Sequence, residues 1–340
     1  MLRRKRVYRF ASIRVVGIGG GGVAAIDHII ERHLYGVDFV AVDSDVERLS
    51  RSGAPVVIPV ASPELRLDLD PHRQPRHDWK RGLRRAVAGS ELVFLVAGLG
   101  GQTGSELVPV AARIARECGA LVIALMTFPF AFEGQRRRVA AEKAVADLKR
   151  KVDTLIVVPS DRLLALSDGE LVFHESYRLA GDLWYQSVQS LHELVNIAGL
   201  INVDFADVRS IMSIGGAAII ASGEGRGESR ALEAAEQATH SSLLEITVDG
   251  ARGVLFNITG GPDLTLDEVH QAAAVIQERA HPEANIIFGA RIDSRLRDAL
   301  SPEPVRISLL ATGCGFGPPS LFQPRHLEQP VIPVLAALQQ

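Results

Sequence analysis

The sequence predicts an α/β protein in which a Rossmann-like domain with a parallel sheet is joined by a long central helix to a smaller α/β domain. Three observations support this fold class. The chain has 340 residues, enough for two hydrophobic cores. Apolar stretches alternate with helical patterns from about residue 13 to 160. A long amphipathic segment then separates this region from a second, shorter alternation.

Five apolar runs define the first sheet. They read IRVVGIG, DFVAVD, ELVFLVAG, LVIALMT and DTLIVVPS, and each is apolar along its whole length. Such strands are typical of a parallel sheet covered by helices on both faces. Between the second and third runs, residues 61–81 are rich in proline and charge, which predicts a surface excursion.

The second half begins with apolar positions three or four residues apart over about 176–196, which predicts the long helix. Helices are expected over 206–221, 228–240 and 266–279, and strands at GVLFNITG, NIIFGARI and VRISLLATG. The expected units are a basic N-terminal arm (1–12), the first domain (13–175), the central helix (176–198), the second domain (199–314) and a short tail (315–340).

Composition excludes several function classes. Thirty-seven basic and 40 acidic residues give a net charge of −3, so no nucleic-acid partner is expected. No apolar run approaches the roughly 20 residues that span a bilayer. The N-terminus MLRRKRVYRF has no signal-peptide core. Cys118 and Cys314 show no metal-ligand spacing, and a cytoplasmic location is expected. The basic arm is either solvated or in weak contact with an anionic membrane surface.

The first glycine turn is GIGGGG. Gly17, Gly19 and Gly22 satisfy G-x-G-x-x-G between a strand and a helix, and Asp43 ends the next strand, where a ribose-binding acid would lie. A dinucleotide-binding oxidoreductase and a tight turn without a ligand are both open on this motif alone. The oxidoreductase alternative lacks a candidate hydride-transfer site, because the ten histidines are scattered.

A second glycine turn, GLGGQTG at residues 98–104, also follows a strand and opens a helix. Its backbone N–H groups can form an anion-binding site at the helix N-terminus. Two such turns on neighbouring strands indicate a polyphosphate enclosed from two sides.

Together with further motifs, these two turns make the chain resemble bacterial FtsZ, the tubulin-like cell-division GTPase. The segments GIGGGG, AGLGGQTG, FPFAFEGQRRR, VDTLIVVPSDRLL, GLINVDFADVRSIMS, GARGVLFNITGGPDLTLDE and NIIFGARID follow in the order and spacing of that family, over about residues 13–313. The resemblance implies the tubulin/FtsZ fold, with a GTPase domain, a central helix and a C-terminal activation domain. It also implies bound GTP or GDP, leaves open whether Mg²⁺ accompanies the nucleotide, and implies head-to-tail protofilaments.

The resemblance assigns candidate residues for the nucleotide. Glu133 and Arg137 match ribose and phosphate contacts, Tyr177 replaces an aromatic residue that stacks on guanine, and Asp182 matches the acid that reads the guanine edge. An ordinary pair on the central helix is the alternative for Tyr177 and Asp182. The remaining expected contacts are Gly19, Gly20, Gly21, Gly22, Asp43, Gly100, Gly101, Gln102, Thr103, Gly104 and Ser105. No metal-ligating residues are expected.

The loop at residues 202–207 carries the expected catalytic residues Asn202, Asp204 and Asp207. In the family this loop is inserted against the nucleotide of the next subunit. Asp204 and Asp207 are three apart at a helix start, so both carboxylates can orient and deprotonate a water aimed at a γ-phosphate. A helix cap formed by the same two residues is the alternative.

Departures from the family pattern concentrate around the phosphates. Val23 and Ala24 replace a glycine and an asparagine, and Gln102 replaces a glycine. Glu106 adds a carboxylate that either points inward, where it would repel a triphosphate, or turns outward to solvent. Residues 61–81 replace a third, glycine-rich loop of the family, and Ser160 replaces an asparagine. Two hypotheses follow: a filament-forming GTPase activated by self-assembly, or a non-hydrolysing FtsZ-like structural protein that polymerises alone or with a co-resident FtsZ.

Overall fold

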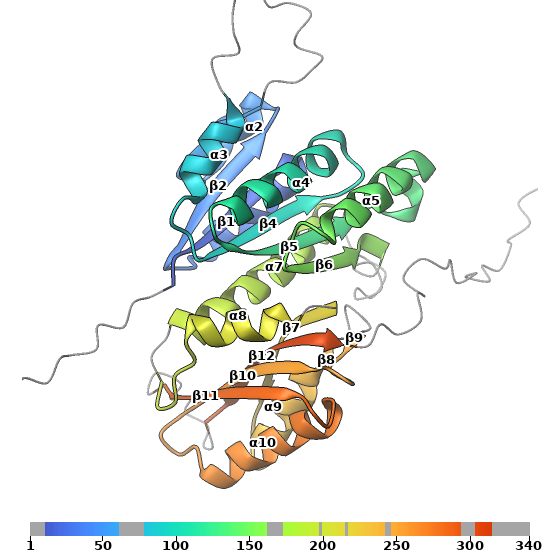
Figure 1. Ribbon diagram of the computed structural model, residues 1–340. Coiled ribbons are helices and arrows are strands. Elements are labelled where there is room, and N and C mark those ends of the chain that lie inside the picture. The colour runs from blue at the N-terminus through green and yellow to red at the C-terminus, as the bar shows by residue number, and fades with distance from the viewer. Residues whose placement is uncertain are drawn as a thin grey trace, which may run out of the picture.

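The structure is a computed structural model that describes residues 11–60, 78–161, 173–196, 199–214, 217–241, 246–293 and 303–314. A six-stranded sheet, a long helix and a four-stranded sheet follow one another through the molecule (Figure 1). The expected surface excursion lies outside the described residues as far as residue 77, and the expected N-terminal arm (to residue 10) and tail also lie outside them.

The six-stranded sheet is parallel throughout, with strand order β3-β2-β1-β4-β5-β6. Its strands are β1 (Ile13–Ile18), β2 (Val37–Asp43), β3 (Val56–Pro59), β4 (Leu92–Gly98), β5 (Leu121–Phe128) and β6 (Thr154–Pro159). The expected parallel sheet is confirmed, with β3 added at one edge. The order reverses between β1 and β4, which is where open α/β sheets bind ligands.

Helices cover both faces of this sheet (Figure 1). They are α1 (Gly19–Glu31), α2 (Val46–Arg51), α3 (Trp79–Val87), α4 (Gln102–Glu117), the short 3₁₀ helix η2 (Ala131–Glu133) and α5 (Gln135–Leu148). Neighbouring residues of a strand face different cores: Val15 packs with the α1 side, and Val16 packs with the α4 and α5 side. This two-sided burial explains why the strands are apolar along their whole length.

The long helix α7 (Phe173–Asn196) lies between the two sheets. Trp184, Val188 and Leu191 are buried in a core that contains Val15 of the first sheet and Leu310 of the second. Because one apolar cluster includes residues of both sheets, α7 joins the two halves through packing and not only through the chain.

The second sheet has the order β11-β10-β12-β7, with β10 parallel to β11 and the other pairs antiparallel. Its strands are β7 (Ala217–Gly225), β10 (Gly253–Gly260), β11 (Asn285–Ile292) and β12 (Val305–Cys314), and the helices beside it are α8 (Phe205–Ser213), α9 (Arg230–Thr239) and α10 (Leu266–Arg279). A small hairpin pairs β8 (His240–Ser241) with β9 (Ile246–Thr247).

The expected helix over 206–221 was wrong in its second half. Helix α8 ends at Ser213, and residues 217–225 form β7 against β12. The cause is tertiary packing: a Cβ atom on Gly223 or Gly225 would overlap backbone of α9, so these glycines let the strand approach that helix closely. Within the described part of the chain, none of the helices is sufficiently long and apolar to cross a membrane.

Candidate functional site

The turn from β1 into α1 leaves the start of the helix without a side-chain cap. The N-cap residue Ile18 accepts no hydrogen bond through its side chain, and the first turn of α1 contains no acidic residue. Gly19 has a φ of 71°, a backbone conformation that other residues rarely adopt. The free N–H groups and the positive end of the helix dipole therefore remain available to an anion.

The turn from β4 into α4 repeats this arrangement. Its N-cap is Gly101, again without a side-chain cap and without an acidic residue in the first turn. Gly100 has a φ of 91°, and its N–H donates to Ser105 Oγ at 2.9 Å. Ser105 thus closes the turn that shapes the second helix N-terminus.

Several turn glycines are needed for packing. A Cβ atom on Gly22 would overlap the carbonyl oxygen of Val96, and one on Gly104 would overlap that of Gly98. These glycines seat α1 and α4 directly on strand β4. Gly22 does not line the cavity described next, so its place in the turn is structural.

Both helix N-termini open into one cavity. Its wall continues through the end of β5 to η2, α5 and α7, and Ser160 after β6 completes it. Nine of the expected nucleotide contacts line this cavity: Gly19, Gly20, Gly21, Gly101, Gln102, Thr103, Gly104, Glu133 and Arg137. The two glycine turns therefore face one enclosed space, as two anion-binding turns around a single ligand require.

Glu133 and Arg137 line the cavity as an ion pair four residues apart. Glu133 also accepts a hydrogen bond from the Phe130 N–H at 2.9 Å, which fixes its carboxylate at the end of η2. Because the Glu133 side chain is largely buried, it holds the more exposed guanidinium of Arg137 at the cavity wall.

Helix α7 contributes two residues that the sequence did not single out, Ala180 and Trp184, and both line the cavity. Asp182 does not. It forms an ion pair with Arg32, lies 2.7 Å from His28 Nε2, and faces a groove beside the second sheet. The Tyr177 side chain lies outside the part of the molecule that the structure describes.

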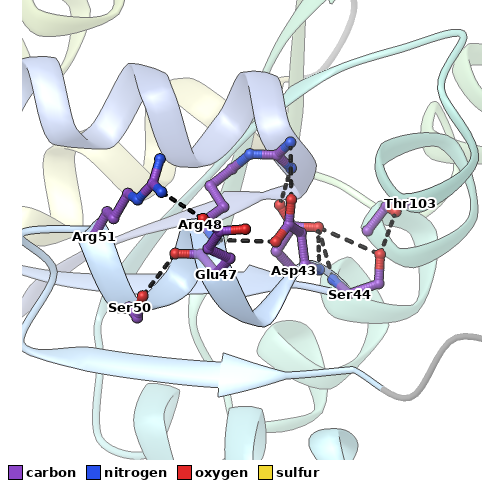
Figure 2. A network of polar contacts seen from close by, with 8 residues as sticks. Asp43, Ser44, Glu47, Arg48, Ser50, Arg51 and Thr103 are labelled. Atoms are coloured by element: carbon purple, nitrogen blue, oxygen red, sulfur yellow. Dashed lines mark hydrogen bonds and ion pairs between the residues drawn. The ribbon is translucent and has the colours of Figure 1, made fainter.

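Asp43 is also engaged elsewhere. Its side chain is 2% exposed, its Oδ1 accepts from the Ser44 N–H at 2.7 Å, and its Oδ2 accepts from Arg48 Nη1 at 2.6 Å. Figure 2 shows this network, together with the contact between the Ser44 and Thr103 hydroxyls. Asp43 therefore organises the turn after β2 and is not among the residues that line the cavity.

Of the two orientations open to Glu106, the structure has the outward one. Glu106 is exposed and lines an outer groove between α4 and α5, with Arg136 and Lys143. Ser105 and Gly100 line the same outer groove. Gln102 lies at the border, because it lines both the cavity and the groove.

Comparison with known proteins identifies the chain. Residues 12–168 match the GTPase domain of the Tubulin/FtsZ family, and residues 216–315 match the C-terminal domain of the FtsZ family. An FtsZ dimer from M. jannaschii is 35% identical, with a TM-score of 0.74 over 90% of this chain and 89% of that one. This protein belongs to the tubulin/FtsZ family. A single-residue mutant of M. jannaschii FtsZ is also 35% identical, with a TM-score of 0.75 over 90% of this chain and 92% of the other.

More distant members of the tubulin/FtsZ fold include CetZ2 from Haloferax volcanii, in a GTPγS-bound protofilament. It is 19% identical, with a TM-score of 0.70 over 90% of this chain and 94% of the other. The resemblance in fold and family expected from the motifs is thus confirmed. A bacterial source and a role in cell division stay predictions.

The loop that the tubulin/FtsZ resemblance marked as catalytic lies at the start of α8, in the half of the molecule that contains the second sheet (Figure 1). Asp204 Oδ1 accepts from the Asp207 N–H, and Asp207 Oδ2 accepts from the Asp204 N–H, both at 3.0 Å. Asn202 Oδ1 accepts from the Gly199 N–H at 2.6 Å. This is a reciprocal helix cap, and none of these residues lines the cavity of its own chain.

The described residues contain no group of three or more His, Cys, Asp or Glu side chains arranged to hold a metal ion.

Proposed function

We propose that this protein is a filament-forming GTPase in which the loop at residues 202–207 of one subunit completes the nucleotide cavity of the next. The observation that carries the proposal is the convergence of two uncapped helix N-termini, those of α1 and α4, on one cavity. The matching family domain is described as a GTPase domain, and this cavity lies within it, apart from its wall on α7.

The cavity has the parts that a guanine nucleotide needs. Backbone N–H groups near Gly20 and Gly101 face the region for the phosphates, and Arg137 adds a fixed positive charge. On the α7 side the cavity is apolar, because Ala180 lies at its wall and the buried Trp184 packs behind it, so a purine ring can lie there. In CetZ1 from Haloferax volcanii, a protein of the same fold, the bound nucleotide is GDP.

Exposed apolar side chains support end-to-end association. Phe132 lies beside Glu133 of the cavity wall and is 68% exposed, and Leu200 beside the catalytic loop is 75% exposed. Ile201, the residue before Asn202, is also exposed. Apolar side chains at both places would be covered if the loop end of one subunit packed on the cavity end of another.

In that arrangement Asp204 and Asp207 act on the neighbour's nucleotide. Each carboxylate uses one oxygen for the helix cap and has a second oxygen that can accept a hydrogen bond from water. The helix cap fixes both carboxylates relative to the loop. Capping and catalysis are therefore compatible, because the cap orients the two carboxylates that act on the water. Positioning and deprotonation of the attacking water would then contribute about 10²- to 10⁴-fold to the rate.

A mixing experiment tests the shared site. One variant, Glu133→Ala with Arg137→Ala, damages the cavity and keeps the loop; the other, Asp204→Asn with Asp207→Asn, damages the loop and keeps the cavity. Each alone should release little phosphate from GTP, and an equimolar mixture should recover turnover because intact cavities meet intact loops. A mixture as inactive as its components, although both variants co-sediment, would contradict the proposal.

A further inference from the structure

Arg48 lies against the N-terminal turn of α1 and was not singled out by the sequence. If Gly20 carried a Cβ atom, that atom would be 2.8 Å from Arg48 Nη1 and 2.9 Å from Arg48 Cζ. Gly20 itself lines the cavity. The guanidinium therefore lies against a residue of the cavity wall, beside the N-terminus of α1, although Arg48 is not itself among the residues that line the cavity.

A cation at this position is unfavourable unless an anion is near, because the N-terminus of a helix already carries partial positive charge. The turn after β2 supplies two carboxylates. Arg48 Nη1 donates to Asp43 Oδ2 at 2.6 Å (Figure 2), and Arg48 Nη2 lies 3.3 Å from Asp45 Oδ2. Asp43 is almost completely buried, so it holds Arg48 in one place.

The guanidinium retains donors for a further partner. Arginine has five N–H donors, of which these two carboxylates engage two. The side chain is 44% exposed, so part of it is open to solvent. Planar guanidinium groups with free N–H donors are well suited to phosphate oxygens.

The two helix N-termini favour an anion in this position. Neither α1 nor α4 has an acidic residue in its first turn. The same turn after β2 reaches the second glycine turn, because the Ser44 and Thr103 hydroxyls lie 3.1 Å apart. Arg48 thus belongs to a third segment that meets the two glycine turns at the region for the phosphates.

We infer that Arg48 is a phosphate ligand of the cavity: Asp43 fixes its guanidinium over Gly20, and the remaining N–H donors bind a phosphate group at the N-terminus of α1. This inference rests on the proposed function, since it assigns one more residue to the same nucleotide site. It predicts that the phosphate chain, and not the base, is what Arg48 recognises.

The test measures binding of GTP and of inorganic tripolyphosphate to the full chain by calorimetry. Arg48→Ala removes the cation but leaves Asp43 buried without its partner, so Arg48→Gln is the decisive variant because its amide can still donate to Asp43. Arg48→Lys keeps the positive charge but lacks the planar guanidinium with its paired N–H donors. Arg51→Ala is the matched control, since Arg51 lies on the same helix, is 76% exposed and pairs with Glu47.

We expect Arg48→Gln to lower the affinity for both ligands by about 10- to 100-fold and Arg48→Lys to lower it less. Arg51→Ala should bind both ligands as the wild type does. Wild-type affinity for both ligands in folded Arg48→Gln would overturn this inference and leave the proposed function standing. A wild-type protein that binds neither ligand would overturn both. A third outcome is also informative: the wild type binds tripolyphosphate, Arg48→Gln loses this binding, and the wild type binds ATP as tightly as GTP. This outcome would support the role of Arg48 as a phosphate ligand and contradict the assignment of guanine as the base.

Discussion

The Ser44 and Thr103 hydroxyl groups lie 3.1 Å apart and connect the turn after β2 to the first turn of α4. Thr103 lines the cavity, whereas Ser44 follows the buried carboxylate of Asp43. This contact joins the turns after β2 and β4, and Arg48, which follows the turn after β2, lies against Gly20 in the turn after β1. The three strand-to-helix turns therefore meet at the place where the nucleotide is proposed to bind.

Loss of this contact should weaken nucleotide binding without unfolding the protein. Thr103→Val keeps the shape of the side chain but removes the hydroxyl, and we expect GTP affinity to fall by about 2- to 10-fold. Thr103→Ser keeps the hydroxyl and should bind as the wild type does. Calorimetric titration of both variants checks this, and equal affinities would show that the hydroxyl contact has no part in binding.

Two glycines of the second turn should differ sharply when each is replaced by alanine. A Cβ atom on Gly104 would overlap the Gly98 carbonyl, whereas one on Gly101 would have no neighbour within 4 Å. We expect Gly104→Ala to lower the free energy of unfolding by about 1–3 kcal/mol and Gly101→Ala to change it by less than about 1 kcal/mol. Urea denaturation measures both; equal losses would refute the packing role given to Gly104.

The sequence predicted five of the six strands of the first sheet, because strands buried on both faces are apolar along their length, and Val15 and Val16 face different cores as this requires. The short edge strand β3 was not expected. The sequence pattern wrongly predicted a helix where β7 lies. Gly223 and Gly225 allow β7 to approach α9 closely, and such a tertiary contact is not visible in the local pattern. In the site, the glycine turns were predictable from their spacing. Arg48 was not, because its role depends on Gly20, which is far from it in sequence.

Asparagine substitutions in the loop at residues 202–207 separate capping from chemistry. Asn caps a helix about as well as Asp but loses the attraction of a carboxylate to the helix dipole, so Asp204→Asn with Asp207→Asn should lower the free energy of unfolding by no more than about 2 kcal/mol. The same variant loses both carboxylates, and GTP turnover should fall by about 100-fold or more while GTP affinity is unchanged. Unchanged turnover at full assembly would remove these residues from the mechanism.

The second domain should lose stability in acid through Glu268. Its carboxylate bonds to the buried guanidinium of Arg230 at 2.6 Å, and this hydrogen bond is the main reason that the pKa of Glu268 lies below its ordinary value of 4.5. A carboxyl with a lowered pKa stabilises the fold above the unfolded-state pKa, and this contribution is lost as the pH falls through the folded-state pKa.

Glu268→Gln should therefore cost about 1–3 kcal/mol at pH 7, because Arg230 is left buried with a weaker partner. The difference from the wild type should shrink as the pH falls below 4.5, the unshifted value for this carboxyl. Urea denaturation across this range measures it. A difference that stays constant down to the acid limit would indicate that the charge of Glu268 is not what stabilises Arg230.

If a second subunit completes the nucleotide site, phosphate release from GTP must depend on protein concentration, and a concentration series measures this. Sedimentation of the same samples reports assembly. Turnover per subunit should rise cooperatively with concentration, in step with the pelleted fraction. Turnover per subunit that is independent of concentration would contradict a shared site, and pelleting without phosphate release would instead favour a filament that does not hydrolyse GTP.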